Sequence, residues 1–120
     1  MTVFTEGPRT AGYLVSEANN FRSRGVGRIA AGTIGTLEAG TVVGKITASG
    51  DFAAYDPTAE DGSEEVAGIL FEAGKAGDDR TFTVRDSEVK ASQLIWFTDA
   101  TPTEIATGTA ALEALGIIVR

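Results

Sequence analysis

The sequence of 120 residues contains no cysteine and no histidine, and it has only three prolines and one tryptophan. Without histidine, no Ser–His–Asp or Cys–His triad can form, and no imidazole can exchange protons near neutral pH. Without cysteine, disulfides, thiolate nucleophiles and iron–sulfur ligands are missing, and ordinary zinc sites need one of these two residue types. These absences exclude the sites that depend on histidine or cysteine. Carboxylate pairs remain among the 17 acidic residues, but nothing in the sequence marks one pair as buried in a cleft, so we predict a protein that is not an enzyme, with no catalytic residue, no cofactor and no metal.

Large hydrophobic side chains are also scarce. Hydrophobic residues make up 42% of the chain, but 18 of them are alanine, and Val, Ile, Leu and Phe together number 29. This composition is sufficient for one small folded domain with a thin core. Because small domains with thin cores often gain stability from association, we expect a protein partner.

Charge is distributed unevenly along the chain. The net charge is −7, to which residues 1–50 contribute +2 and residues 51–120 contribute −9. Nucleic-acid binding needs clustered cations, which an acidic body does not offer. No apolar run is long enough to span a membrane, and the N-terminus lacks the basic and apolar regions of a secretory signal. We expect a protein made in the cytoplasm that binds neither nucleic acid nor membranes.

The first 24 residues differ from the rest of the chain. They contain single hydrophobic side chains without a sustained period, and turn-forming pairs at Gly7–Pro8 and Asn19–Asn20. Two interpretations stay open: a first strand packed on the domain, or an extended arm that becomes ordered on a partner. We divide the chain into an N-terminal arm, residues 1–24, and a β-rich domain, residues 25–120. The predicted contact residues of the arm are Phe4, Tyr13, Leu14, Val15, Phe21, Arg22 and Arg24.

After the arm, short β segments alternate with turns. The pair Ser49–Gly50 predicts a hairpin turn between two strands. Clean alternation over residues 80–86 predicts a strand with Phe82 and Val84 inward and Thr83 outward. The predicted β segments are residues 28–31, 40–48, 52–55, 66–71, 80–86, 92–97 and 117–119.

One helix is predicted, near the C-terminus. Thr101 is a good N-cap, Pro102 suits the first helical position, and Glu104 completes a capping box. One helical face carries Ile105, Gly108, Leu112 and Leu115, and Gly116 suits the C-terminal end. The fold class is therefore mainly β, with one short C-terminal helix.

Two segments look like ligand-binding motifs but do not meet the requirements of those motifs. The string Gly25–Ala30 matches G-x-G-x-x-A, but no strand precedes it and no helix follows, so we interpret it as a flexible hinge between arm and domain. The acidic segment 56–65 does not fit a calcium-binding loop, because aligning Gly62 with the required glycine puts Pro57 and Ala59 at ligand positions. We expect a solvated surface loop there.

Three arginines, Arg22, Arg24 and Arg28, form a small predicted basic patch, with no acidic residue between Ala18 and Leu37. This patch is either a solvated face or a docking site for an acidic protein surface. Trp96, within an apolar stretch, is predicted to lie in the core or in a subunit interface and not to form a ligand platform.

A series of short strings occurs in order along residues 14–120. They are Leu14–Asn19, Ser23–Arg24, Gly40–Thr47, Tyr55–Asp56, Asp61–Gly62, Ala67–Leu70, Leu94–Trp96 and Ala114–Val119. The series resembles that of the head decoration proteins of tailed phages, the family typified by lambda protein D. One departure is Phe97, where we expect a proline after the tryptophan.

The resemblance implies a bent-ribbon β-clip fold and a structural role without catalysis. It implies a homotrimer that binds the major capsid protein on the outer surface of the expanded head, at local three-fold axes. There it would cement neighbouring subunits against the pressure of packaged DNA, with the N-terminal arm reaching the shell. The alternative is a small β-rich module that binds carbohydrate or peptide.

Overall fold

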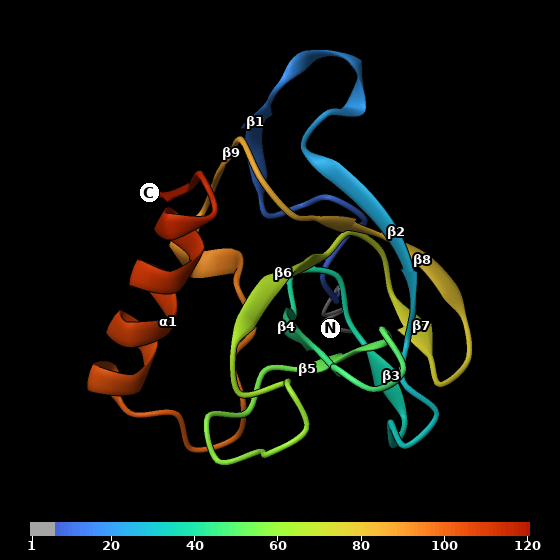
Figure 1. The fold of residues 1–120 in the computed structure, drawn as a ribbon. Helices are drawn as coiled ribbons and strands as arrows, with labels where there is room; N and C mark the ends of the chain where they lie inside the picture. The colour runs from blue at the N-terminus through green and yellow to red at the C-terminus, as the bar shows by residue number, and fades with distance from the viewer. Residues whose placement is uncertain (1–6) are drawn as a thin grey trace, which may run out of the picture.

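The computed structural model describes residues 7–120, which form ten β-strands, two short 3₁₀ helices and one α-helix. The helix stands at one side of the strands (Figure 1). The mainly-β class with one C-terminal helix is therefore confirmed for the described part of the chain. The elements are β1 (Leu14–Glu17), η1 (Asn19–Phe21), β2 (Arg24–Arg28), β3 (Thr36–Leu37), β4 (Val42–Lys45), β5 (Phe52–Ala54), β6 (Val66–Leu70), β7 (Gly74–Lys75), β8 (Asp79–Thr83), β9 (Ser87–Val89), η2 (Ala91–Gln93), α1 (Pro102–Ala114) and β10 (Ile117–Val119).

The largest sheet has five antiparallel strands in the order β2-β8-β6-β4-β5. It curves until its two edges meet, because an isolated bridge joins Ile29, directly after β2, to Phe52 at the start of β5. The Ala30 amide donates to the Phe52 carbonyl at 2.8 Å in the same place. Strands β4 and β5 form the predicted hairpin, with Gly50 at φ 76° in its turn. This nearly closed sheet is the largest sheet of the described residues and forms the body of the protein.

A smaller three-stranded sheet joins the two ends of the chain. Its order is β1-β9-β10, with β1 antiparallel and β10 parallel to the central strand β9. A two-stranded ribbon, β3-β7, lies at another edge of the molecule (Figure 1). The three-stranded sheet places β1, from the predicted arm, in the folded body.

The predicted helix is confirmed together with its capping box. The Thr101 hydroxyl accepts from the Glu104 amide at 3.2 Å, and the Glu104 carboxylate accepts from the Thr101 amide at 3.1 Å. Gly108 and Leu112 are buried on the inner face of α1. Gly116, at φ 84°, ends the helix as predicted and leads directly into β10.

Two hydrophobic clusters lie on opposite faces of β4 and β6, because side chains alternate along a strand. Val42 and Ile69 belong to one cluster, and their neighbours Val43 and Leu70 belong to the other. We call the first the helix cluster; its buried members are Tyr13, Val42, Tyr55, Ile69, Val89, Leu94, Leu112 and Ile117. We call the second the sheet cluster; its buried members are Ile29, Val43, Phe52, Leu70 and Phe82.

Several predictions from local patterns were wrong. Residues 92–97, expected as a strand, form the end of η2 and a loop in which Ile95 makes an isolated bridge to Thr41, and the strand expected over residues 28–31 ends at Arg28. Thr83, expected to face solvent, is fully buried because the Tyr13 side chain, directly before β1, lies against it, and the two hydroxyls are hydrogen-bonded at 2.6 Å. The expected hinge at Gly25–Ala30 is mostly strand β2, which pairs with β8 along its whole length. Gly27 is required there because the Phe52 ring occupies the space that a Cβ would fill. In residues 7–120, no helix is long and apolar enough to cross a bilayer.

Candidate functional site

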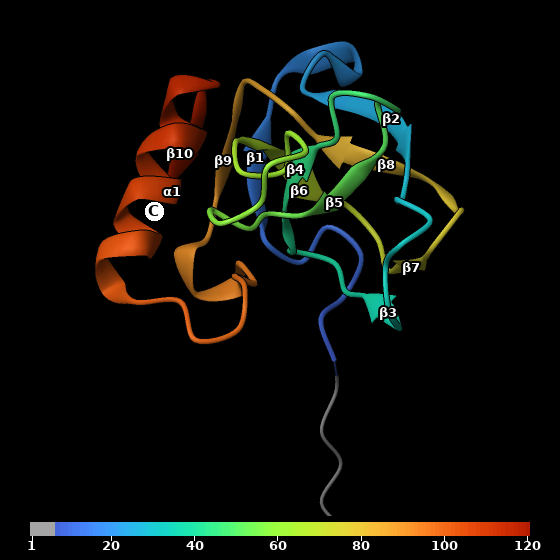
Figure 2. The same cartoon turned by 60° about the horizontal axis from the view of Figure 1, so that its bottom comes forward.

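The N-terminal segment extends away from the folded body (Figure 2). Gly7, Pro8, Arg9 and Thr10 are exposed. The segment is attached to the body at Ala11, whose amide donates to the Phe71 carbonyl at 2.7 Å. Tyr13 is buried, and the next four residues form β1, which pairs with β9. Phe4, one of the predicted contact residues, lies outside the described residues.

Tyr13, a second predicted contact residue, belongs to the core. Its side chain is 1% exposed, and its hydroxyl is bonded to Thr83. Burial raises the pKa of the Tyr13 phenol to about 12, with the nearby Glu17 carboxylate acting in the same direction. The ring is therefore a neutral, fixed component of the helix cluster, and it is not available as a surface contact in this conformation.

Leu14 and Val15 lie on β1 and face different surroundings. Leu14 is half-buried against the helix cluster, whereas Val15 is 49% exposed. Ile118, on β10, is exposed to a similar degree, 47%. Of the two predicted contact residues Leu14 and Val15, Val15 is therefore the one that a partner could reach.

Phe21 and Arg24 are brought together by the turn at η1. The Phe21 ring is 67% exposed, and the backbone at Asn20 and Phe21 adopts φ values of 61° and 59°, an uncommon conformation for a bulky residue. The Arg24 guanidinium lies 4.6 Å from the Phe21 ring centroid and 4.5 Å from that of Phe71. This arrangement is a cation between two aromatic rings, with one ring exposed.

Acidic partners neutralise two of the three arginines of the predicted patch. Arg24 forms a two-point ion pair with Glu17, at 2.6 and 3.1 Å, which lowers the pKa of the Glu17 carboxyl. Arg22 lies 3.4 Å from Asp86. Arg28 is exposed and forms no ion pair within residues 7–120. Glu17 lies just before the acid-free stretch, whereas Asp86 is distant in sequence and directly precedes β9.

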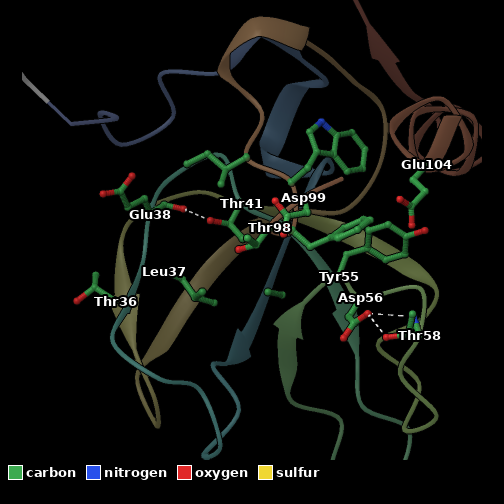
Figure 3. A pocket seen from close by; sticks show the side chains of 14 residues that line it. Thr36, Leu37, Glu38, Thr41, Tyr55, Asp56, Thr58, Thr98, Asp99 and Glu104 are labelled. Atoms are coloured by element: carbon green, nitrogen blue, oxygen red, sulfur yellow. Dashed lines mark hydrogen bonds between the residues drawn. The ribbon is translucent and has the colours of Figure 1, made fainter. Parts of the chain in front are cut away.

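An open groove lies between the loop before α1, the end of β5 and strand β3 (Figure 3). It has a volume of about 780 Å³, within the usual range for ligand pockets. We call it the aromatic groove, because Tyr55, Trp96 and Phe97 line it. Tyr55 meets the other two rings edge to face, at centroid distances of 6.2 and 5.8 Å.

Carboxylates surround the aromatic groove. They are Glu38, Asp56, Asp99 and Glu104, and in the described part of the chain no basic side chain lines it. Two hydrogen bonds from Thr58, one from its hydroxyl and one from its amide, lower the pKa of the Asp56 carboxyl. Burial raises the pKa of the Tyr55 phenol, and the charges of Glu104 and Asp56 raise it further. The groove therefore combines neutral aromatic surface with negative charge.

The acidic loop 56–65 is held by its own side chains. Asp56 accepts from Thr58, and Asp61 accepts from the amide and hydroxyl of Ser63, which lowers the pKa of the Asp61 carboxyl. Among the residues that the structure describes, no group of three or more acidic side chains is arranged to hold a metal ion.

A family model described as bacteriophage lambda head decoration protein D matches residues 3–117. The chain belongs to this family. The match covers nearly the whole sequence, including both hydrophobic clusters, the helix and the aromatic groove. Among curated proteins, no match was found. The head decoration family is one of structural capsid proteins, so membership supports a role in decorating a phage head and a location in the virion capsid.

The aromatic groove was not predicted from the sequence. Trp96 was expected in the core or in a subunit interface, and it does pack half-buried against the helix cluster. The four carboxylates carry no local signal, since they are a few of the 17 acidic residues and lie in three segments. The one local signal that could have indicated the groove is the Trp96–Phe97 pair, which stands directly before a polar turn and a capped helix.

Proposed function

We propose that this protein cements the capsid of a tailed phage. It binds the outside of the expanded head as a trimer at local three-fold axes, and there it holds neighbouring shell subunits together against the pressure of packaged DNA. It is made in the host cytoplasm and acts without catalysis or a cofactor. The observation that carries this proposal is the family match over residues 3–117.

The structure supports different roles for the folded body and for the N-terminal segment that extends from it. Residues 7–10 are exposed and leave the body in one direction, whereas β1 and β2 are paired with neighbouring strands. We therefore restrict the proposed arm to the residues before Tyr13. An extended segment can satisfy its backbone amides and carbonyls by adding to a strand edge of the shell protein.

The test is the binding of the purified protein to expanded, undecorated heads. Deleting residues 2–10 should leave the melting temperature nearly unchanged and weaken binding about a hundredfold, equivalent to about 2.7 kcal/mol. Deleting residues 2–20, which removes Tyr13 and β1, should instead prevent stable folding. Full-length protein that does not bind expanded heads would refute the cementing role. A protein shortened by residues 2–10 that binds normally would refute the role of the arm.

The arrangement on the head is tested separately. Electron microscopy of decorated heads should show density at the three-fold positions, while sedimentation at micromolar concentration should show mostly monomer. Docking at adjacent lattice sites raises the effective concentration of neighbours, so the trimer can form on the head and remain weak in solution. A stable dimer in both settings would contradict the proposal, because a two-fold interface uses the same patch of both copies.

A further inference from the structure

The aromatic groove has features that its contribution to the core does not explain. Its walls are apolar and aromatic, from Leu37, Tyr55, Ile95, Trp96 and Phe97, yet it is open to solvent. Its four carboxylates come from three segments of the chain, and none of them forms an ion pair within residues 7–120. An open apolar surface surrounded by uncompensated negative charge suits a ligand that is both cationic and partly apolar.

We propose that the aromatic groove binds the side chain of an arginine or lysine that the shell protein presents on an extended segment. This inference rests on the proposed function, since it names the partner of the same docking face. The alkyl part of such a side chain packs on apolar walls, while its charged end needs acidic or aromatic neighbours. The groove offers both within one cavity.

The aromatic part of the groove is fixed before a ligand arrives. Trp96 packs against α1 at Gly108, where a Cβ would overlap its ring, and Tyr55 is 5% exposed. The Tyr55 hydroxyl points toward the Glu104 carboxylate (Figure 3). Because these groups are already in place, binding a cation requires little ordering of the protein.

The acidic part of the groove keeps hydrogen-bonding capacity for a ligand. One Glu104 oxygen accepts from the Thr101 amide, and one Asp56 oxygen accepts from Thr58, which leaves the second oxygen of each carboxylate for a donor. Glu38 and Asp99 are exposed on other sides of the groove. A guanidinium presents five N–H donors in a plane and can satisfy several of these oxygens together.

Charge favours the shell protein as the partner. The proposed function supplies the shell as the surface to which this protein docks, and a cationic shell side chain complements the four carboxylates of the groove. The net charge of this chain, −7, disfavours a second copy as the occupant.

The single tryptophan makes the groove directly measurable, because Trp96 is the only source of tryptophan fluorescence. The probes are blocked tripeptides, Ac-Gly-Arg-Gly-amide with its lysine and citrulline analogues. Citrulline has nearly the shape of arginine but no charge. The arginine and lysine peptides should change the Trp96 emission and bind at least about tenfold more tightly than the citrulline peptide, as expected for a partly desolvated cation on an aromatic face.

A matched pair of variants tests the carboxylates. The test variant is E38Q/D99N/E104Q. Its glutamine at position 104 can still serve the capping box, and its asparagine at position 99 tolerates the left-handed backbone there, where φ is 62°. The control variant is E60Q/E65Q/E113Q, which removes the same charge at exposed positions outside the groove.

The two variants should differ in binding and agree in stability. The test variant should lose at least about tenfold in arginine-peptide binding and in head binding, while the control stays within about twofold of the original. Equal melting temperatures confirm that both variants are folded.

The outcomes separate this inference from the proposed function. If the peptides do not bind, or the citrulline peptide binds equally well, the groove is not a cation site even if the protein decorates heads. If the peptides bind but the protein does not bind heads, the cementing role and the shell partner fail together. If the test variant changes self-association and leaves head binding intact, the occupant is a second copy of this chain, and the shell assignment is overturned.

Discussion

The sheet cluster and the helix cluster share strands β4 and β6 but are built differently. The buried side chains of the sheet cluster are all apolar, and Phe52 and Phe82 stack in it with ring centroids 4.0 Å apart. The helix cluster joins residues from Tyr13 to Ile117 and contains the buried Tyr13–Thr83 hydrogen bond. It also reaches the surface, because Tyr55 belongs to both this cluster and the aromatic groove. The comparison teaches that one face of the sheet provides stability, while the other also positions the candidate binding site.

The largest expected effect is in the sheet cluster. Phe82→Ala should lower the free energy of unfolding by about 4 kcal/mol, because it removes a fully buried ring and the stacking with Phe52. Urea denaturation followed by circular dichroism measures this. Below the melting temperature, Trp96 emission and head binding should be unchanged. A change in Trp96 emission in the folded variant would show that the two clusters are not separate in function.

Leu112→Ala tests the helix cluster and should cost about 3 kcal/mol, since Leu112 is fully buried between α1 and the sheet. Unlike Phe82→Ala, it should also shift Trp96 emission in the folded protein, because Trp96 packs against the same helix. Buried Leu→Ala substitutions usually cost about 2–5 kcal/mol, so a loss of less than about half a kcal/mol would contradict the packing of α1.

Alkaline pH tests the buried polar pair of the helix cluster. Burial raises the pKa of Tyr13 to about 12, whereas the unfolded chain titrates near 10.0. Above pH 10 the unfolded state binds fewer protons than the folded state, so stability should fall by about 2 to 3 kcal/mol between pH 10 and pH 12. Urea denaturation at pH values from 10 to 12 measures this, and the Tyr13→Phe variant should lose less stability over the range than the original protein. The loss that remains should include a share from Tyr55, whose pKa is also raised.

The Tyr13→Phe variant has its own cost at neutral pH. It leaves the buried Thr83 hydroxyl without its partner and should lower stability by about 1 kcal/mol or slightly more. The double variant Tyr13→Phe/Thr83→Val should recover part of this loss. An unchanged alkaline slope in the single variant would mean that Tyr13 is not the group that titrates.

The smallest effect is expected at Gly108, where the helix meets Trp96. Alanine favours a helix by about 1 kcal/mol over glycine, but here its methyl group would overlap the Trp96 ring. Since crowding of this kind typically costs about 1–3 kcal/mol, Gly108→Ala should be neutral to mildly destabilising and should shift Trp96 emission. In a Trp96→Ala background the same substitution should stabilise the helix. A gain in stability with the original Trp96 would show that the ring moves freely, and the groove would not be preformed.

Local signals in the sequence determined the elements whose causes lie within a few residues. Thr101, Pro102 and Glu104 are sufficient to start the helix, and the Gly50 turn specifies the β4–β5 hairpin. The apolar run of residues 66–71 indicated a buried strand, and side chains of β6 belong to both hydrophobic clusters. The ordered strings along the chain also indicated the family, which the match over residues 3–117 confirmed.

Only the tertiary structure decided which side chains are free to act. Thr83 looks solvent-facing from strand alternation, and Tyr13 looks like part of an arm, yet they meet in the core across 70 positions of sequence. Likewise, Arg22 is neutralised by Asp86, and the aromatic groove combines residues from 36 to 104. Strand alternation specifies two faces but not what covers each face. The cover comes from segments distant in sequence, so burial, ion pairing and the shape of the groove follow from the assembled fold.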